Sequence, residues 1–383
     1  MASTAAVLAL LLLFVPSLHA AVSGKACSCY LTSTHDLFNT YRVHDFRRLP
    51  IPASIPALPS QLPPTITDST SHSSIPIGTL QQGFLTSKEW TSSWDIQTWG
   101  KGVNNETKYK MWNSLSSVYI DYENITTTIT TTTGKVGTRL VLKTRRFEGF
   151  QISAEVENLQ KNLLHASTRI RARVLGDPGA VAGLFYYRND NNESDIEILT
   201  RDEASAIWYS NQPVLDSDGN QIPNASTRAD LITNSLTDGT QLTSKRSSEF
   251  SWSDWHTHRI DWTAGKSSWF VDGNHVLDKT YGVPTATAYL VLNMWSDGGV
   301  WSGVMDVGKE ARLEIEWIEM AFNTSDEGTE NKEREPGQGG DGCRRACVVD
   351  DRAPSLSAAG RIVGGLREGI MAAVVVVVLA QWL

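Results

Sequence analysis

The stretch that decides the fold reads Glu193-Ser-Asp-Ile-Glu-Ile-Leu199. Acidic side chains alternate in it with serine and isoleucine, and alternate residues of a β-strand point to opposite faces. One face of the predicted strand therefore suits a core. The other carries three carboxylates in a row, with Cα atoms about 6.6 Å apart. These carboxylates belong to Glu193, Asp195 and Glu197.

Further strands are predicted on both sides of this stretch. Residues 169–174 alternate with period two, and residues 176–179 have the Gly-Asp-Pro-Gly composition of a turn. Residues 255–262 and 267–271 are predicted to form two later strands, ahead of an Asp-Gly-Asn turn. Strands at this density predict an all-β fold, a sandwich of two antiparallel sheets.

Three carboxylates in a row repel one another and so destabilise the fold, which suggests that the row serves a function. Hydrolysis of a glycosidic bond needs one ionised carboxylate and one protonated carboxylic acid. Neighbouring acids supply both, because the charge of one raises the pKa of the next. On this motif alone, the alternatives are a solvated acidic strand face and a calcium site.

Four segments, in order over about residues 84–322, carry a family resemblance. They are Glu193-Ser-Asp-Ile-Glu197, Ser253-Asp-Trp-His-Thr-His-Arg-Ile-Asp-Trp262, Phe270-Val-Asp-Gly273, and Leu290-Val-Leu-Asn-Met-Trp-Ser-Asp-Gly-Gly299 preceded by Pro284. Together they resemble glycoside hydrolase family 16 in its fungal branch, whose signature is Glu-x-Asp-x-Glu. One departure is Ser194, where the family usually has Ile, Leu or Val; its hydroxyl needs a partner in the core.

The resemblance implies a β-jelly-roll sandwich of the concanavalin A-like lectin/glucanase type, with a substrate cleft on its concave sheet. It also implies that Glu193 is the nucleophile and Glu197 the general acid/base, with Asp195 tuning the pair. Sugar rings stack on aromatic faces and sugar hydroxyls bond to amides. The predicted substrate-binding residues are therefore Trp295, Trp301, Trp208, Tyr209, Asn211 and Gln212. Tyr186 and Tyr187 are adjacent, so only one of them can face the cleft.

Both ends of the chain predict a secreted, membrane-attached protein. Residues 1–20 are predicted to be a signal peptide, with an uncut signal anchor as the alternative. Residues 21–83 form an N-terminal arm and the start of the domain, residues 84–324 the family 16 domain, and residues 325–357 a polar stalk. Residues 358–383 resemble a GPI-attachment signal with its apolar tail, and a single-pass anchor is the alternative.

The four cysteines fit an oxidising compartment, and the favoured arrangement joins Cys27 and Cys29 to Cys343 and Cys347, although the sequence leaves all three pairings open. The net charge of −8 gives a nucleic acid no general attraction. We expect a monomer whose partner is a β-glucan, with no cofactor and no bound metal.

Five asparagines begin sequons for N-glycosylation: Asn105, Asn124, Asn192, Asn224 and Asn323. We predict that Asn192 stays unglycosylated, because its side chain points towards the core.

The leading hypothesis is a retaining endo-β-glucanase acting on β-1,3- or mixed β-1,3/1,4-glucan of a cell wall. A transglycosylase that remodels a wall would use the same covalent intermediate with a sugar as acceptor. A glucan-binding lectin without activity is the third hypothesis, and the intact acids count against it.

Overall fold

The computed structural model describes residues 27–124, 136–237, 240, 249–325, 343, 345–349 and 361–362. The predicted signal peptide, most of the stalk and the apolar tail lie outside the described residues. Among the residues described, no helix is long and apolar enough to cross a membrane.

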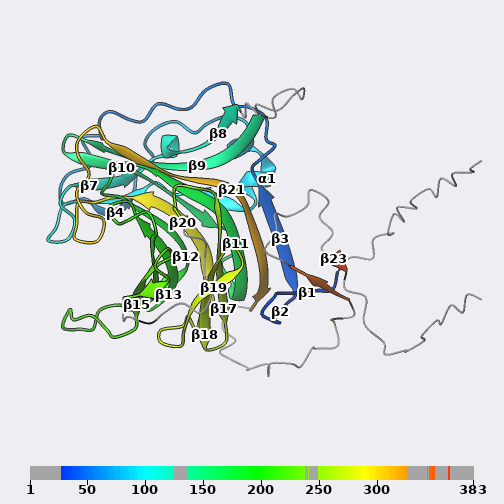
Figure 1. Ribbon diagram of the computed structural model, residues 1–383. Helices are drawn as coiled ribbons and strands as arrows, with labels where there is room; N and C mark the ends of the chain where they lie inside the picture. The colour runs from blue at the N-terminus through cyan, green and yellow to red at the C-terminus, as the bar shows by residue number, and fades with distance from the viewer. Residues whose placement is uncertain are drawn as a thin grey trace, which may run out of the picture.

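Two sheets packed face to face make up the body of the molecule, which confirms the predicted fold class (Figure 1). We call the sheet that carries the acidic stretch the front sheet. Its strands run in the order β5 (Trp94–Ile96), β10 (Phe150–Asn158), β20 (Tyr289–Trp295), β12 (Val181–Asn189), β13 (Asn192–Leu199), β14 (Ala206–Asn211), β15 (Ser226–Asp230) and β16 (Ser235–Leu236).

The other sheet, the back sheet, is built around β21 (Glu310–Thr324), which crosses the middle of Figure 1. One side of β21 pairs with β11 (Leu163–Gly176), and the other pairs with β9 (Val136–Phe147) and β3 (Thr40–Asp45). The remaining strands are β17 (His256–Thr263), β18 (Lys266–Val271), β19 (Asn274–Lys279), β8 (Val118–Asn124), β7 (Lys110–Asn113), β6 (Trp99–Lys101) and β4 (Ser71–Ser74).

β10 joins the two sheets. Its first residues pair with β7 and β9 of the back sheet, and its last residues pair with β20 and β5 of the front sheet. The helical elements described are short: η1 (Phe84–Thr86), α1 (Lys88–Thr91) and η2 (Leu115–Ser117). Paired strands are therefore the main regular structure of the described residues, as the density of predicted strands indicates.

A single large apolar core fills the space between the sheets. It includes Trp262, which is fully buried. Trp255 is only half-buried and lies under the guanidinium of Arg173, 4.6 Å from the ring centre. The turn predicted at residues 176–179 forms, since β11 ends at Gly176 and β12 begins at Val181.

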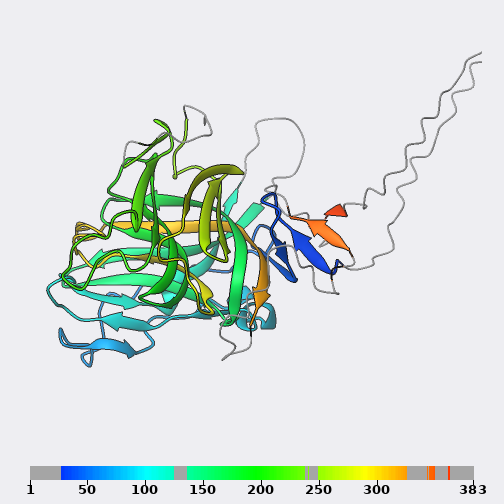
Figure 2. The same cartoon turned by 90° about the horizontal axis from the view of Figure 1, so that it is seen from below.

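A small third sheet clasps the two ends of the domain (Figure 2). It contains β1 (Cys29–Leu31), β2 (Leu37–Phe38), β22 (Ala346–Val348) and β23 (Arg361–Ile362). Disulfides join Cys27 to Cys347 and Cys29 to Cys343, so the favoured arrangement of the cysteines is confirmed. β22 lies inside the segment predicted to be a stalk, which is therefore ordered at this point.

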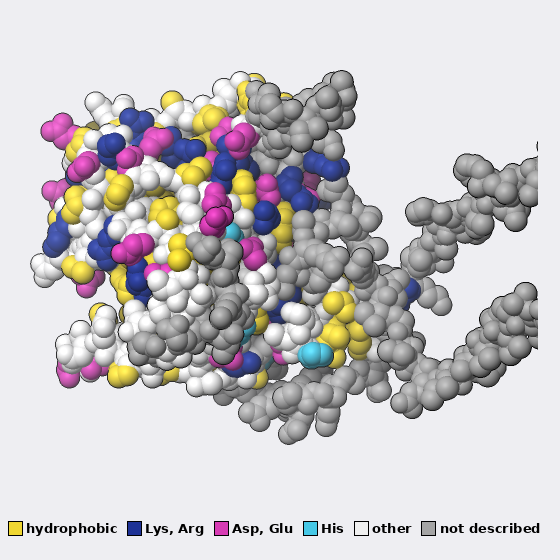
Figure 3. All heavy atoms as spheres, in the orientation of Figure 1, with side chains coloured by type: hydrophobic (Ala, Val, Ile, Leu, Met, Phe, Trp, Pro, Cys, Tyr) yellow, Lys and Arg dark blue, Asp and Glu magenta, His cyan; other side chains and the backbone are white. Residues whose placement is uncertain are grey.

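Positive and negative side chains are interspersed on the face shown in Figure 3. Ion pairs between neighbouring strands include Arg173 with the buried Glu314 at 2.8 Å and Lys143 with Glu310 at 2.8 Å. The net negative charge is therefore not gathered into one patch on this face.

Candidate active site

The three acids lie on β13, near the middle of the front sheet, and they share its outer face. Across the β12–β13 hairpin, Glu193 pairs with Tyr187, Asp195 with Phe185 and Glu197 with Gly183. The intervening residues are buried and face the core: Ser194, Ile196 and Ile198. Strand alternation therefore produces the row that the sequence predicts.

Burial perturbs the ionisation of all three groups. Loss of solvent raises the pKa of Glu193 and of Glu197 to about 7. Asp195 is only 2% exposed, and burial together with the charges of both glutamates raises its pKa well above the ordinary range. Contact between Asp195 and Glu193 lowers the pKa of Glu193 and raises that of Asp195, so Asp195 is the member of this pair that more readily holds a proton.

The row thus places two glutamates, whose pKa values are raised to about 7, on either side of an aspartic acid whose pKa is raised as well. A glycosidase needs one carboxylate and one carboxylic acid on either side of the scissile bond. Protonated Asp195 stabilises the carboxylate form of Glu193, and Glu197 lies two residues further along the same face. The arrangement can therefore hold one base and one acid at the same pH.

Ser194 finds its partners in the core. Its hydroxyl lies 2.6 Å from Oδ1 of Asn211 and 3.0 Å from the hydroxyl of Ser267. The amide nitrogen of Asn211 donates in turn to the carbonyl of Tyr281 at 2.8 Å. The departure from the family pattern is thus accommodated by a buried polar network behind the acids.

This network corrects two of the predicted sugar contacts. Asn211 is fully buried on the inner face, and its amide is engaged by Ser194 and Tyr281. Tyr209 is also fully buried and packs against Trp269. The physical reason is that side chains alternate between the two faces of β14. Tyr209 and Asn211 are two residues apart, so both face the core, while Trp208 faces outwards beside Glu197. The prediction that either residue binds sugar is wrong.

The other predicted contacts lie on the outer face. Trp208 is the neighbour of Glu197 across β14, and its indole donates to Asp202 at 2.7 Å. Trp301 meets it edge to face at 5.0 Å between ring centres, and its own indole N–H donates to Oε1 of Glu197 at 3.0 Å. Trp301 therefore contacts an acid directly, which the sequence did not predict.

Gln212 and Trp295 complete this set. The amide nitrogen of Gln212 lies 3.4 Å from Oδ2 of Asp195, so Gln212 also reaches the acid row. Trp295 is half-buried at the end of β20, with Nζ of Lys101 5.0 Å from its ring centre. Tyr187, not Tyr186, is the tyrosine on the outer face, because Tyr186 is fully buried in the core.

Sequence reasoning missed the other half of the site, which comes from β10 and β20. Pairing places Glu155, Asn293, Gly183 and Glu197 side by side across four strands. Glu155 accepts from the indole of Trp99 at 2.7 Å, and burial raises its pKa to about 7. Asn293 is the one amide side chain in the apolar run of residues 290–295, and this was the available sign that it belongs to the site. The pairing of Glu155 with Asn293 could not be predicted, because the two residues lie far apart in the sequence.

Gly183 makes this close arrangement possible. Its backbone N–H donates to Oδ1 of Asn293 at 3.1 Å, and a Cβ at this position would lie 2.5 Å from the same oxygen. Only glycine leaves room for the amide between Glu155 and Glu197.

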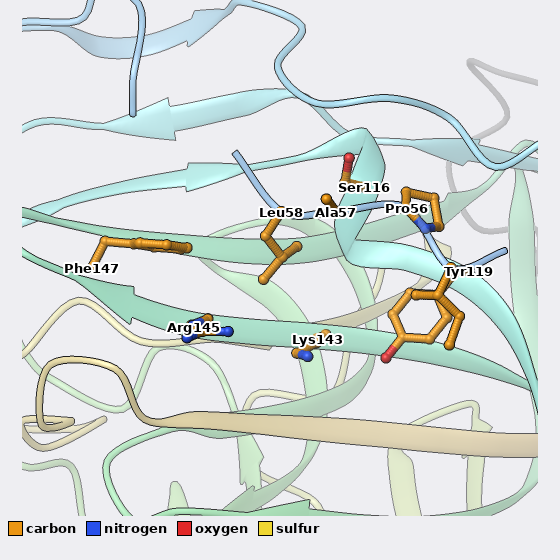
Figure 4. A pocket seen from close by; sticks show the side chains of 9 residues that line it. Pro56, Ala57, Leu58, Ser116, Tyr119, Lys143, Arg145 and Phe147 are labelled. Carbon is orange, nitrogen blue, oxygen red and sulfur yellow. The ribbon is translucent and has the colours of Figure 1, made fainter. Parts of the chain in front are cut away.

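A cavity of about 360 Å³ lies elsewhere, between the N-terminal arm and the back sheet (Figure 4). Residues 55–58 form one wall, and Tyr119, Lys143 and Phe147 are among the residues opposite. It contains none of the three acids. Within the part of the chain that the structure describes, no group of three or more His, Cys, Asp or Glu is arranged to hold a metal ion.

Comparison with known proteins defines the class of the chain. Residues 105–319 match the model of the glycosyl hydrolases family 16, and the chain belongs to this family. It is 26% identical over 163 residues to a beta-glucanase of Acetivibrio thermocellus, covering 40% of this chain and 41% of the relative. It is 29% identical over 70 residues to a beta-glucanase of Paenibacillus polymyxa, covering 18% of this chain and 29% of the relative. The matches therefore span less than half the length of either relative.

Solved structures also match the chain. The beta-glucanase of Bacillus licheniformis superposes with a TM-score of 0.43 at 16% identity, covering 61% of this chain and 94% of that one. The laminarinase catalytic domain of Thermotoga maritima superposes with a TM-score of 0.42 at 16% identity, covering 61% of this chain and 93% of that one.

Proposed function

We propose that this family 16 protein is a retaining endo-β-glucanase acting on β-1,3- or mixed β-1,3/1,4-glucan. The observation that carries the proposal is the row of three carboxyl groups on the outer face of β13, where burial raises the pKa of all three. Two relatives that the chain matches are beta-glucanases, which supports the substrate class.

Glu193 is the proposed nucleophile and Glu197 the proposed general acid/base. In the first step, Glu193 bonds to the anomeric carbon while Glu197 gives its proton to the departing glycosidic oxygen. In the second step, water attacks that carbon, its proton passes to Glu197, and the bond to Glu193 breaks. Retention requires the two carboxyl groups to approach to about 5–5.5 Å.

Asp195 has a supporting part in this scheme. Its proton is directed at Glu193, which favours the carboxylate form that attacks and leaves. Because the hydrogen bond is to the leaving carboxylate, it also helps the covalent intermediate to break down. Trp208 and Trp295 supply aromatic faces for sugar rings, and Glu155 and Asn293 supply hydrogen-bonding groups on the other side of Gly183.

We further propose that the protein is secreted, glycosylated and attached to the membrane or wall through a GPI anchor, as a monomer of the fungal branch. This rests on the apolar N-terminal run, the small-residue site, spacer and apolar tail at the C-terminus, and the sequons. The two disulfides fit an oxidising route.

The test compares wild type with Glu193→Gln on laminarin and lichenan. Shorter oligosaccharides from wild type alone would support hydrolysis through β13. Products longer than the donor would move the assignment to a transglycosylase. Undiminished binding by both proteins without any turnover would favour the lectin.

A further inference from the structure

Trp301 sits on a loop that is held in place from several sides, the β20–β21 loop. The side chain of Asp297 accepts from the backbone N–H of Gly299 at 2.9 Å and from the hydroxyl of Ser302 at 3.0 Å. Its second oxygen pairs with Lys101 at 2.8 Å. These contacts bind both flanks of Trp301 to one buried carboxylate.

Two further contacts fix the same loop to the body of the domain. The guanidinium of Arg201 donates to the carbonyl of Val300 at 2.6 Å, and the hydroxyls of Tyr109 and Ser296 lie 3.1 Å apart. Gly298 packs so closely on Tyr109 that a Cβ there would lie 2.4 Å from the ring. The position of Trp301 is therefore set by the fold before any ligand binds.

The ring of Trp301 is oriented by its neighbour. Trp208 meets it at an interplanar angle of 67°, an edge-to-face contact that aromatic pairs favour. Trp208 is held in turn by its hydrogen bond to Asp202. With backbone and ring both fixed, the indole N–H is aimed at Oε1 of Glu197, 3.0 Å away.

We propose that Trp301 is a positioning residue for Glu197, whose indole N–H holds Oε1 and so leaves the proton of the acid on Oε2. An indole N–H can only donate, so it bonds to an oxygen that carries no proton. The proton is thereby confined to one oxygen, and the carboxylate that forms when this proton leaves keeps a charge-assisted hydrogen bond. This rests on the proposed glycosidase function, in which Glu197 gives up and regains a proton in each cycle.

The titratable and charged groups around Glu197 come from four places. Glu193 and Asp195 lie beside it on β13, Asp202 and Arg228 lie beyond Trp208, Glu155 lies beyond Asn293, and Arg201 holds the loop. Arg228 is paired with Asp202 and Glu203. Burial raises the pKa of Glu197 and the hydrogen bond from Trp301 lowers it, so losing this bond alone moves the pKa upwards.

The first arm of the test measures activity against pH for Trp301→Phe, which keeps an aromatic ring and removes the N–H. We expect the basic limb of kcat to move up by about 1 to 2 pH units, since a hydrogen bond to a charged group contributes that much. Trp255→Phe is the matched control, because this tryptophan lies under the guanidinium of Arg173 on the back sheet, away from the acids, and its replacement should leave the limb in place. If the basic limb of kcat in Trp301→Phe stays at the wild-type pH and only KM rises, Trp301 contributes only a stacking surface for sugar. This result would overturn the proposal.

The second arm needs no substrate. In protein labelled with ¹⁵N-tryptophan, the indole signal missing from Trp301→Phe identifies Trp301. We expect this signal to move with pH around neutrality in wild type and to stop moving in Glu197→Gln. A signal that does not titrate, or titrates equally in both, would overturn the positioning role. If wild type hydrolyses no glucan, the proposed function fails, and this arm still decides the hydrogen bond.

Discussion

Replacing Glu197 by glutamine should make the fold more stable at high pH, because the native protein pays a cost to bury this carboxyl group. The amide keeps an oxygen that can accept from Trp301. It carries no charge, so it avoids the desolvation that raises the pKa of Glu197 to about 7. Activity should be lost in the same variant.

The sign follows from proton binding. The folded state holds a proton on Glu197 up to about pH 7, whereas the unfolded chain releases it near pH 4.5. Between these values the unfolded state binds fewer protons, so the stability of wild type falls as pH rises. For one such group the loss between pH 5 and pH 8 is about 2.5 kcal/mol, and partial exposure of Glu197 makes this an upper bound.

Urea denaturation of wild type and Glu197→Gln at pH 5 and pH 8 measures this difference. Between pH 5 and pH 8, the free energy of unfolding of the variant should rise relative to that of wild type by up to about 2.5 kcal/mol. Glu148→Gln, at an exposed glutamate in the β9–β10 turn, is the control and should change stability by less than about 0.5 kcal/mol at both values. Equal stability changes of Glu197→Gln at pH 5 and pH 8 would refute the reasoning.

Three further predictions concern the surroundings of the acids. Gly183→Ala should destabilise the fold by about 1–3 kcal/mol and lower turnover, because its Cβ would collide with Asn293; unchanged turnover would show that this spacing is not needed. Ser194→Ala should cost about 1–3 kcal/mol in urea denaturation, since Asn211 loses its buried donor; a neutral result would mean that water replaces the hydroxyl. Asn192 should be free of glycan in glycopeptide mass spectrometry, because its amide bonds within the domain; a glycan there would contradict the strand assignment.

Strand alternation carried the sequence-based prediction further than any other signal. It placed the three acids on one face and predicted that only one of Tyr186 and Tyr187 is exposed on it. The same rule, applied to β14, would have separated Trp208 from Tyr209, and the wrong prediction for Tyr209 came from choosing neighbours in sequence instead of neighbours on a face.

The rest of the site depends on long-range pairing. Glu155 reaches the acid row because β10 pairs with β20 and β20 pairs with β12, and no local pattern contains those registers. The hydrogen bond from Trp301 to Glu197 depends on how the β20–β21 loop folds back over the sheet. Loop geometry of this kind is set by buried contacts such as those of Asp297, which composition and periodicity do not specify.

The most direct test of the account is azide rescue with an aryl β-laminaribioside that has a good leaving group. In Glu193→Gly, the space vacated by the nucleophile lies on the face opposite the leaving group, so azide should attack there and give the α-glycosyl azide. In Glu197→Gly, the covalent intermediate still forms, and azide should give the β-glycosyl azide. A β-product from Glu193→Gly, or rescue of neither variant while wild type cleaves the substrate, would contradict the roles assigned to the two glutamates.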